Sequence, residues 1–260
     1  MAELIFLGTG ASTGIPILSC TCEVCNSTDS YNKRLRSSVL IHSGKTNIVI
    51  DSTPDFRSQC LRENLQRIDA IFLTHSHSDH IFGLEDVRLF TQSDLDKKTI
   101  PIYCDYRTLS EVKKIFYHAC ENNYVGGLPM LNLKEVGIET YVNDLCVKTI
   151  ELIHGQFYCT GYIIGNLAYL VDVSNISSES MNKLRGIDIL VIDATRFDSH
   201  PNHLSVSHAI DISRELNTKK TYITHIDHTV LHSRDSKRLP KGISFAYDGL
   251  KIKFSKLSND

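Results

Sequence analysis

The stretch Thr74-His75-Ser76-His77-Ser78-Asp79-His80 places four side chains that commonly bind metal ions within six residues. It follows an apolar run at residues 68–73, which predicts a buried strand that ends at this point. Residues two apart on an extended chain face the same side, so the first two imidazoles can bind one ion. Asp79 and His80 follow where the chain turns, and the H-x-H-x-D-H pattern therefore predicts a centre for two adjacent metal ions. The alternative is a polar loop with surface histidines, which a pattern this specific does not favour.

The composition is that of an ordinary globular protein. Of 260 residues, 42% are hydrophobic and 22% are charged, so we expect one domain over residues 1–260 with a large apolar core. The net charge of −2 argues against a broad basic surface for non-specific nucleic-acid binding. The sequence has no apolar run of membrane-spanning length, and residues 1–8 lack the basic segment of a signal peptide. We therefore expect a cytoplasmic protein with neither a transmembrane helix nor a signal peptide.

Strand-like and helix-like patterns follow one another along the chain. Apolar runs at 38–42 and 46–51, separated by Ser43-Gly44-Lys45, predict a hairpin. Helical spacing of apolar residues predicts helices over 108–124 and 205–216. These elements fit two sheets with helices outside them. Further strands are predicted at 147–153, 160–164, 168–173, 187–192 and 221–224.

One loop cannot complete the coordination of two ions, so further ligands are expected at the ends of later strands. Three candidates each follow an apolar run directly: His154, Asp172 and His225. Any one of them alone would more often be a buried structural residue. Together, and after the H-x-H-x-D-H stretch, they predict the rest of a two-metal site.

The cysteines suggest a second metal site. Cys20, Cys22 and Cys25 stand at C-x-C-x-x-C spacing, which suits a tetrahedral zinc ion with a fourth ligand from elsewhere. His228, three residues after His225, is the best candidate for that ligand. The alternatives are three reduced cysteines without a metal, or a redox pair. Disulfides are not expected in a reducing compartment.

The ordered set of these residues resembles the metallo-β-lactamase superfamily over nearly the whole chain. The resemblance implies an α/β fold, an αβ/βα four-layer sandwich with two facing mixed β-sheets and outer helices, whose metal site lies at one sheet edge. The cysteine loop and the H-x-x-H pair also resemble the phosphodiesterase family of the carbon–phosphorus lyase pathway. The resemblance assigns His75, His77 and His154 to one ion, Asp79, His80 and His225 to the other, and Asp172 to both.

The resemblance also suggests catalytic residues. His203 matches a histidine that contacts the scissile phosphate in the resembled enzymes, while His200 and His208 are its competitors. Asp79 is expected to orient the attacking water or accept its proton, besides binding a metal. Asp51 and Asp193, which both end strands, are expected to orient loops beside the centre rather than to bind a metal. Arg36 and Ser38 are expected beside the centre as well.

The predicted function is a metal-dependent phosphodiesterase that cleaves a small cyclic phosphate or a nucleotide-like phosphodiester through a hydroxide held between two ions. The predicted cofactors are two manganese or zinc ions and one structural zinc. One alternative is a ribonuclease Z-like RNA-processing nuclease, although the insertion at 94–98 is too short for a tRNA-gripping arm. The others are a thioester or lactam hydrolase and a non-catalytic redox metal-binding module. The expected partner is a small-molecule substrate, whose identity depends on loops such as 124–130. The sequence does not decide whether the protein forms a homodimer.

Overall fold

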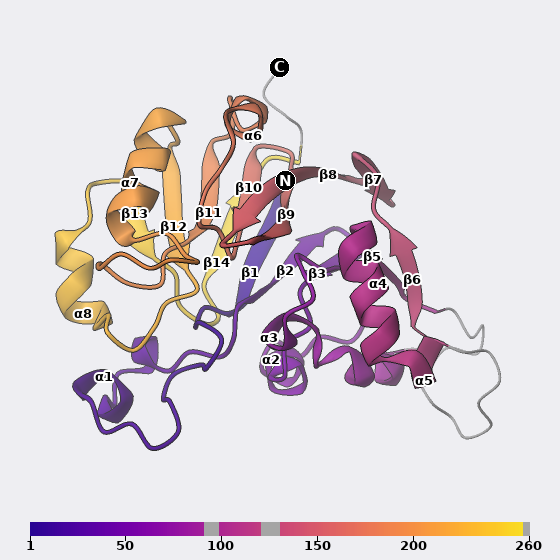
Figure 1. The fold of residues 1–260 in the computed structure, drawn as a ribbon, viewed down its shortest axis with the longest axis horizontal. Coiled ribbons are helices and arrows are strands. Elements are labelled where there is room, and N and C mark those ends of the chain that lie inside the picture. Colours follow the sequence, from indigo (N-terminus) through magenta and orange to yellow (C-terminus); the bar gives the residue numbers. More distant parts are fainter. Residues whose placement is uncertain (91–98, 121–130, 257–260) are drawn as a thin grey trace.

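In the computed structural model, residues 1–90, 99–120 and 131–256 are described. Within these ranges two seven-stranded sheets face each other, with helices outside (Figure 1). The predicted α/β sandwich with two mixed sheets is thus confirmed. The segments 94–98 and 124–130, which the sequence analysis considered as an insertion and a specificity loop, lie outside the described residues.

The first sheet combines an antiparallel half and a parallel half. Its antiparallel half contains the predicted hairpin at 38–50, and its other half is parallel. From edge to edge, its strands are β14 (Lys251–Phe254), β1 (Ala2–Gly8), β2 (Ser38–Ser43), β3 (Thr46–Ile50), β4 (Ala70–Phe72), β5 (Pro101–Cys104) and β6 (Asn132–Glu135).

The second sheet is built in the same way. Its parallel half lies at one edge and an antiparallel meander of four consecutive strands, the first of the four at the sheet edge, lies at the other. Its strands are, in order, β13 (Ile243–Phe245), β12 (Lys220–Thr224), β11 (Ile189–Asp193), β10 (Leu167–Leu170), β9 (Phe157–Ile164), β8 (Leu145–His154) and β7 (Glu139–Val142).

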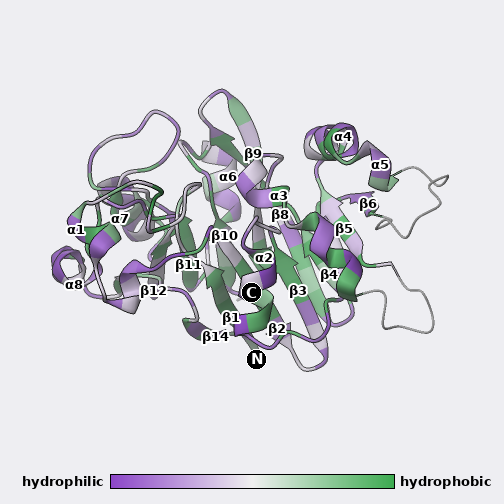
Figure 2. Cartoon of the chain, turned by 90° about the horizontal axis from the view of Figure 1, so that it is seen from below, coloured by the Kyte–Doolittle hydropathy of each residue, from purple (hydrophilic) through white to green (hydrophobic). Residues whose placement is uncertain are grey.

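The period-two alternation of side chains explains the layers. In β2, Val39 and Ile41 enter the core between the sheets, whereas Leu40 enters the core between the first sheet and its helices. In β10, Tyr169 faces the other sheet and Leu170 faces the outer helices. Strands that are buried on both faces have continuous apolar sequences. Figure 2 shows such hydrophobic strands in the interior and helices of mixed hydropathy around them.

The helices pack on the outer faces of the sheets. The helix predicted at 205–216 is α7, which Ser205 caps through its hydroxyl. The helix predicted at 108–124 is interrupted: α4 (Tyr106–Ile115) ends first, a separate four-residue helix, α5 (Tyr117–Cys120), follows, and 121–124 lie outside the described residues. On the first sheet lie α2 (Phe56–Arg62), α3 (Ser78–Ile81), η2 (Leu84–Phe90), α4 (Tyr106–Ile115) and α5 (Tyr117–Cys120), and on the second α6 (Ser178–Lys183) and α7 (Val206–Glu215).

The remaining short helices lie in the N- and C-terminal loops: α1 (Glu23–Asn26), η1 (Ser30–Asn32), α8 (His232–Asp235) and η3 (Ser236–Arg238). Among the helices of the described ranges, none is long and apolar enough to cross a membrane.

Candidate metal centre

The ends of four strands bring the predicted ligands to one edge of the sandwich. The chain leaves β4 through His75 and turns into α3 at His77, so Asp79 and His80 lie in the first turn of that helix. Strand β8 ends at His154. The other two ligands follow β10 and β12. We call these seven residues the His/Asp centre: His75, His77, Asp79, His80, His154, Asp172 and His225.

Three residues at this edge have left-handed backbone conformations. Asp51, Asp172 and His225 have φ angles of 65°, 60° and 57°. Such values are uncommon for residues other than glycine, and they concentrate at functional sites where surrounding structure holds the strain. Each of the three follows a buried strand, β3, β10 or β12, so the turn directs its side chain out of the sheet register toward the centre.

One group of ligands contains His75, His77, His154 and Asp172, whose ligand atoms all lie within 4.8 Å of one another. His75 Nε2 is 3.1 Å from Asp172 Oδ2, and His154 Nε2 is 3.9 Å from the same oxygen. His77 is exposed while the other three are buried, so this group opens to solvent on the His77 side.

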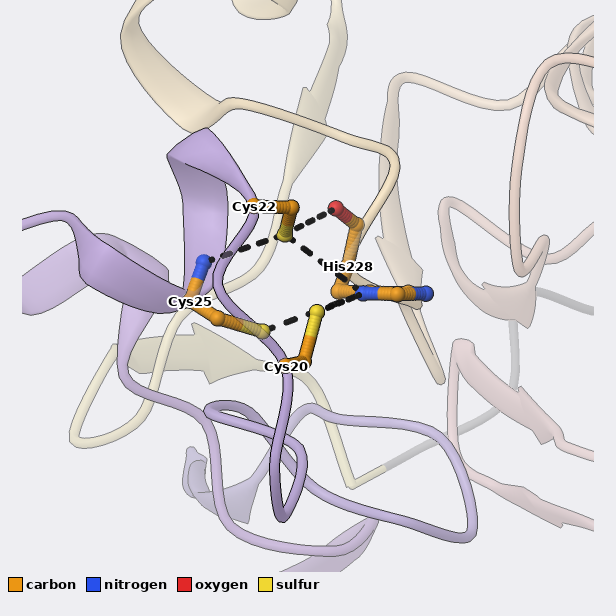
Figure 3. A group of neighbouring side chains, drawn as sticks. All are labelled: Cys20, Cys22, Cys25 and His228. Carbon is orange, nitrogen blue, oxygen red and sulfur yellow. Dashed lines mark hydrogen bonds between the residues drawn. The ribbon is translucent and has the colours of Figure 1, made fainter.

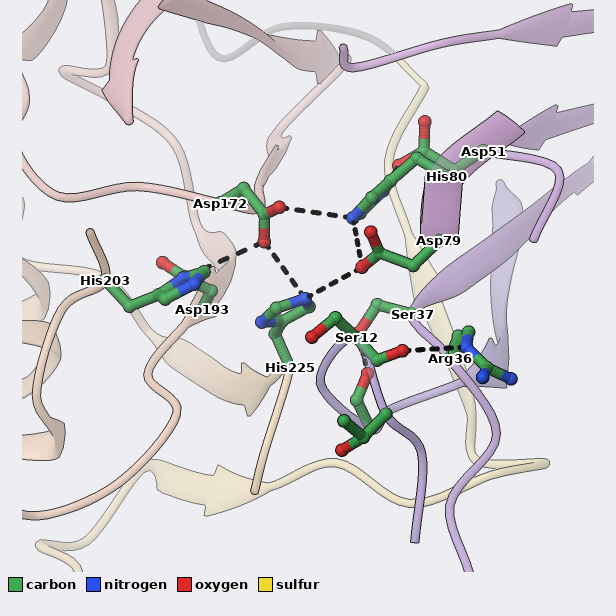
Figure 4. Close-up of polar contacts among 12 residues, drawn as sticks. Ser12, Arg36, Ser37, Asp51, Asp79, His80, Asp172, Asp193, His203 and His225 are labelled. Carbon is green, nitrogen blue, oxygen red and sulfur yellow. Dashed lines mark hydrogen bonds and ion pairs between the residues drawn. The ribbon is translucent and has the colours of Figure 1, made fainter. Parts of the chain in front are cut away.

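A second group shares Asp172 with the first and adds Asp79, His80 and His225 (Figure 4). His80 Nε2 lies 3.2 Å from Asp172 Oδ2 and 3.2 Å from Asp79 Oδ2. His225 Nε2 lies 3.0 Å from the other carboxylate oxygen of Asp172, Oδ1. One carboxylate therefore lies between two sets of donors.

The unsatisfied atoms of this centre fit two cations. Among the described residues, Nε2 of His75, His80 and His225 and Oδ1 of Asp172 are buried without a hydrogen-bond partner. Buried polar atoms normally have one. Imidazole nitrogens and carboxylate oxygens are ligands for divalent metals such as zinc, so bound ions would satisfy all four atoms.

The pKa values also suit metal binding. Burial lowers the pKa of His154 to about 4, and desolvation by neighbouring groups lowers that of His77 to about 4 although part of its side chain stays exposed, so both imidazoles are neutral at pH 7. Burial alone would raise the pKa of Asp172, but His225 and His80 hold it well below its usual value. Metals bind the neutral imidazole and the carboxylate, and His77, His154 and Asp172 present those forms. Against the effect of burial, Asp51 and Asp172 raise the pKa of His80, and Asp172 raises that of His225, so a bound ion would displace protons from these two rings.

Neighbouring groups orient the ligands. Nδ1 of His80 donates to Asp51 Oδ2 at 2.7 Å, and Nδ1 of His154 donates to the backbone oxygen of Asn202 at 2.8 Å. Thr74 also donates to Asp51, at 2.9 Å. Such contacts fix ring orientation at metal sites. Sequence reasoning missed Thr74 and Asn202: the first adjoins the motif and could have been noticed, whereas a backbone oxygen leaves no sequence signal.

Of the three candidate catalytic histidines, the structure brings His203 to the centre. Its Nδ1 lies 2.8 Å from Asp193 Oδ2 and 3.9 Å from Asp172 Oδ1. Burial lowers the pKa of His203 to about 4. The ring of His200 lies farther out, 4.9 Å from that of His203, and His208 lies exposed on α7.

The predicted neighbours Arg36 and Ser38 support the site rather than enter its ligand groups. Arg36 forms a salt bridge with Asp55 at 3.0 Å and donates to the backbone oxygen of Ser12 at 2.8 Å. Ser38 donates to the backbone oxygen of Asp51 at 2.8 Å. These contacts hold the N-terminal loop and the Asp51 turn beside the centre (Figure 4).

The second predicted cluster, Cys20, Cys22, Cys25 and His228, also comes together, and we call it the cysteine cluster (Figure 3). The three sulfur atoms lie 3.2, 3.5 and 3.8 Å from His228 Nδ1. The backbone N–H of Cys25, 3.4 Å from the Cys22 sulfur, lowers the pKa of Cys22 to about 6. Three thiols and one imidazole nitrogen within 4.8 Å of one another fit a tetrahedral zinc ion.

A family model described as the beta-lactamase superfamily domain matches residues 46–226, which contain the whole His/Asp centre. The chain belongs to the beta-lactamase superfamily. The predicted superfamily is thereby confirmed.

Relatives within this superfamily carry different names. A crystal structure of a diphosphatase of the PhnP family is 37% identical, with 100% of both chains covered and a TM-score of 0.92. An octanoyltransferase of Porphyromonas gingivalis is 35% identical over 95% of this chain but only 50% of its own length. A ribonuclease Z of Bacillus mycoides is 29% identical over 62% of this chain and 48% of its own.

The chain thus spans about half the length of these two curated relatives. The octanoyltransferase name belongs to a protein with as much chain again beyond the matched part. The superfamily match and the diphosphatase neighbour support the predicted class, a metal-dependent hydrolase.

Proposed function

We propose that this protein is a metal-dependent phosphodiesterase that acts on a small cyclic phosphate or a nucleotide-like phosphodiester. The observation that carries the proposal is the position of Asp172 between two groups of donors whose facing atoms are buried and without hydrogen-bond partners. The PhnP-family diphosphatase, at 37% identity over the full chain, supports phosphoryl chemistry.

We assign His75, His77 and His154 to one ion, and Asp79, His80 and His225 to the other, with Asp172 shared. Two manganese or zinc ions bound there would supply a water molecule with a pKa lowered toward about 7 and would neutralise charge on the phosphoryl oxygens. Asp79 lies at the edge of the second group and is the candidate to accept the proton of the attacking water.

His203 has a different task, because its Nδ1 is engaged by Asp193 and its Nε2 is left to face the substrate. It would hydrogen-bond the scissile phosphoryl group or protonate the departing oxygen once the bound anionic phosphate raises its pKa from about 4 and its Nε2 gains a proton. A positioned acid of this kind typically speeds a reaction by about 10²–10⁴-fold. Asp193 fixes the ring and does not itself contact the substrate in this scheme.

The cysteine cluster would bind the third ion, a structural zinc. It lies next to the centre along the chain, because His228 follows His225 by three residues. Between them, Ile226 pairs with the N-terminal loop: its N–H donates to the Thr9 oxygen at 2.9 Å, and its oxygen accepts from Ala11 at 3.0 Å. Zinc in the cluster would therefore anchor the loop that carries His225.

A side-by-side substrate panel tests the proposed reaction. Bis(p-nitrophenyl) phosphate, a 2′,3′-cyclic nucleotide, a dinucleoside diphosphate, a tRNA precursor and an octanoyl thioester would be offered to the metal-loaded protein. The last three arms represent the names of the relatives. We expect turnover of the two phosphodiesters. Turnover of the dinucleoside diphosphate in addition would show that the centre also accepts a P–O–P linkage. Exclusive thioester turnover would contradict the proposal, and exclusive RNA cleavage would select the ribonuclease Z alternative.

The panel needs an inactive variant and a metal analysis as controls. His75→Ala, with its fold checked by circular dichroism, must abolish turnover of every substrate that the centre cleaves. Metal analysis of the same sample addresses the non-catalytic alternative, because a redox module would hold a coloured, redox-active iron pair and hydrolyse nothing. We further propose a single domain over residues 1–260, a cytoplasmic location and a small-molecule partner, with a homodimer to be tested by sedimentation.

A further inference from the structure

The open side of the His/Asp centre carries an exposed aromatic side chain. His77 is the one exposed ligand in its group, so the centre is open to solvent on this side. The ring of Phe157 lies beside it, with centroids 6.1 Å apart and planes at 78°. Phe157 is 64% exposed. Single exposed apolar side chains are normal on a protein surface, so the position of Phe157 beside an exposed ligand, and not its exposure alone, points to a role at this centre.

Phe157 is held in place by the same hairpin that carries a ligand. It pairs with His154 across the two-residue turn between β8 and β9, so both residues lie on one face of the hairpin. The turn itself is fixed at Gly155, whose N–H donates to Ser174 Oγ at 2.9 Å. A Cβ at Gly155, which has a φ of 60°, would lie 2.5 Å from Asn202 Oδ1.

The opposite face of the hairpin is braced as well. Tyr158 lies over the guanidinium of Arg107, with 4.4 Å between the ring centroid and Cζ. Arg107 in turn forms a salt bridge with Glu151 at 2.8 Å and donates to the hydroxyl of Tyr106 at 3.0 Å. The Phe157 ring therefore stands on a fixed support rather than on a free loop.

We propose that Phe157 stacks on the planar organic group of the substrate, which makes the substrate class a phosphodiester that carries a nucleobase or a comparable aromatic ring. This inference rests on the proposed function, since it places the phosphoryl group at the His/Asp centre. A substrate held there extends outward past His77, along the exposed face of Phe157. Stacking between a base and an aromatic side chain tolerates any base, because every base has a π-face.

Kinetics of Phe157→Ala on two matched substrates test the proposal. For adenosine 2′,3′-cyclic phosphate we expect KM to rise about tenfold with kcat nearly unchanged, within the range of base–aromatic stacking. For the base-free methyl riboside 2,3-cyclic phosphate we expect no change. Phe157→Tyr should restore the wild-type KM. The control is Tyr141→Ala on edge strand β7, an aromatic residue of similar exposure, 68%, which pairs with Cys146 near the start of β8, whereas the ligand His154 ends that strand.

A binding measurement keeps this test separate from the reaction. Calorimetry would compare adenosine 5′-monophosphate with ribose 5-phosphate on the metal-loaded wild type and on Phe157→Ala. If the wild type binds the nucleotide more tightly than ribose 5-phosphate and Phe157→Ala does not, the stacking role is supported. Absence of cleavage of both cyclic phosphates would count against the proposed reaction alone and would leave this binding result valid. Equal affinities, or equal kinetic losses on both cyclic phosphates, would overturn the stacking role. A variant that changes only the sedimentation behaviour would also overturn it and assign Phe157 to a subunit contact.

Discussion

The His/Asp centre and the cysteine cluster share one loop, at His225 and His228, but the fold builds them differently. In the centre, strand ends and the first turn of α3 hold the ligands, and partners such as Asp51 orient them. The cysteine cluster lies in an irregular loop with one four-residue helix, α1. Its apolar support is small: Ile15, Val24 and Cys25 are its buried hydrophobic residues.

This difference indicates what each ion would do. The centre is organised by two sheets and their cores, so its ions would add chemistry to a site that already exists. The cysteine loop has little buried surface of its own, and binding of an ion would supply much of its folding free energy. Loss of metal should therefore abolish turnover at the His/Asp centre and destabilise the fold of the cysteine loop.

The largest expected effect is that of Asp172→Asn. Removing the shared charge should release both ions of the centre and lower turnover at least about 10³-fold, because metal ions supply several kcal/mol of transition-state stabilisation. The zinc of the cysteine cluster should remain. Metal analysis and phosphodiester kinetics measure both, with Asp211→Asn on the exposed face of α7 as the control. Retention of all three ions would break the comparison.

His203→Gln should act on chemistry alone. We expect all three ions to stay bound while kcat falls by about 10²-fold or more, as for the loss of a positioned acid. His208→Gln, exposed on the neighbouring helix α7, is the matched control and should be neutral. Similar losses in the two variants, or loss of metal from His203→Gln, would show that His203 has no special place in the reaction.

Asp51→Asn separates the two clusters by their supporting contacts. Asp51 accepts hydrogen bonds from His80 and Thr74 without joining either ligand group. Its replacement should weaken metal binding at the centre about 10–100-fold, and leave the cysteine cluster unchanged. Competition with a chromogenic chelator measures both affinities in one titration, and an unchanged affinity at the centre would refute the orienting role.

The smallest expected effect on turnover is that of Cys22→Ser. The variant should lose one ion, melt at a lower temperature and exchange amide hydrogens faster over residues 17–34, yet keep most of its phosphodiesterase activity. Cys146→Ser, a half-buried cysteine outside both clusters, is the control. Loss of the two other ions together with this one would mean that the cysteine cluster builds the centre through the shared loop.

Local signals in the sequence predicted much of this architecture. The hairpin of the runs at 38–42 and 46–51 and the helix over 205–216 depend on neighbouring residues, and both are present. The His/Asp side chains could be selected because each follows an apolar run. Their assembly into two groups around Asp172 could not be derived from spacing, because it depends on how the two sheets face each other, and only the family resemblance implied it.

Other features were missed because their causes are not local. Strand β14 alternates apolar and charged residues, a readable signal, but its partner β1 lies at the other end of the chain. The strand predicted at 160–164 begins at Phe157, and this extension adds the exposed aromatic residue beside His77. Sequence periodicity does not predict that an apolar side chain such as Phe157 is exposed, because its exposure depends on the hairpin and on the contact of Arg107 with the neighbouring Tyr158.

Turnover as a function of metal added back to the stripped protein tests most directly whether the His/Asp centre is a two-metal hydrolytic site. A chelator-treated sample would receive manganese or zinc stepwise, with bis(p-nitrophenyl) phosphate hydrolysis measured at each step and the cysteine-bound zinc counted separately. We expect no hydrolysis without added metal and a rise that ends when two ions per chain occupy the His/Asp centre. Full hydrolysis by the metal-free protein, or a rise that survives Asp172→Asn, would contradict this assignment.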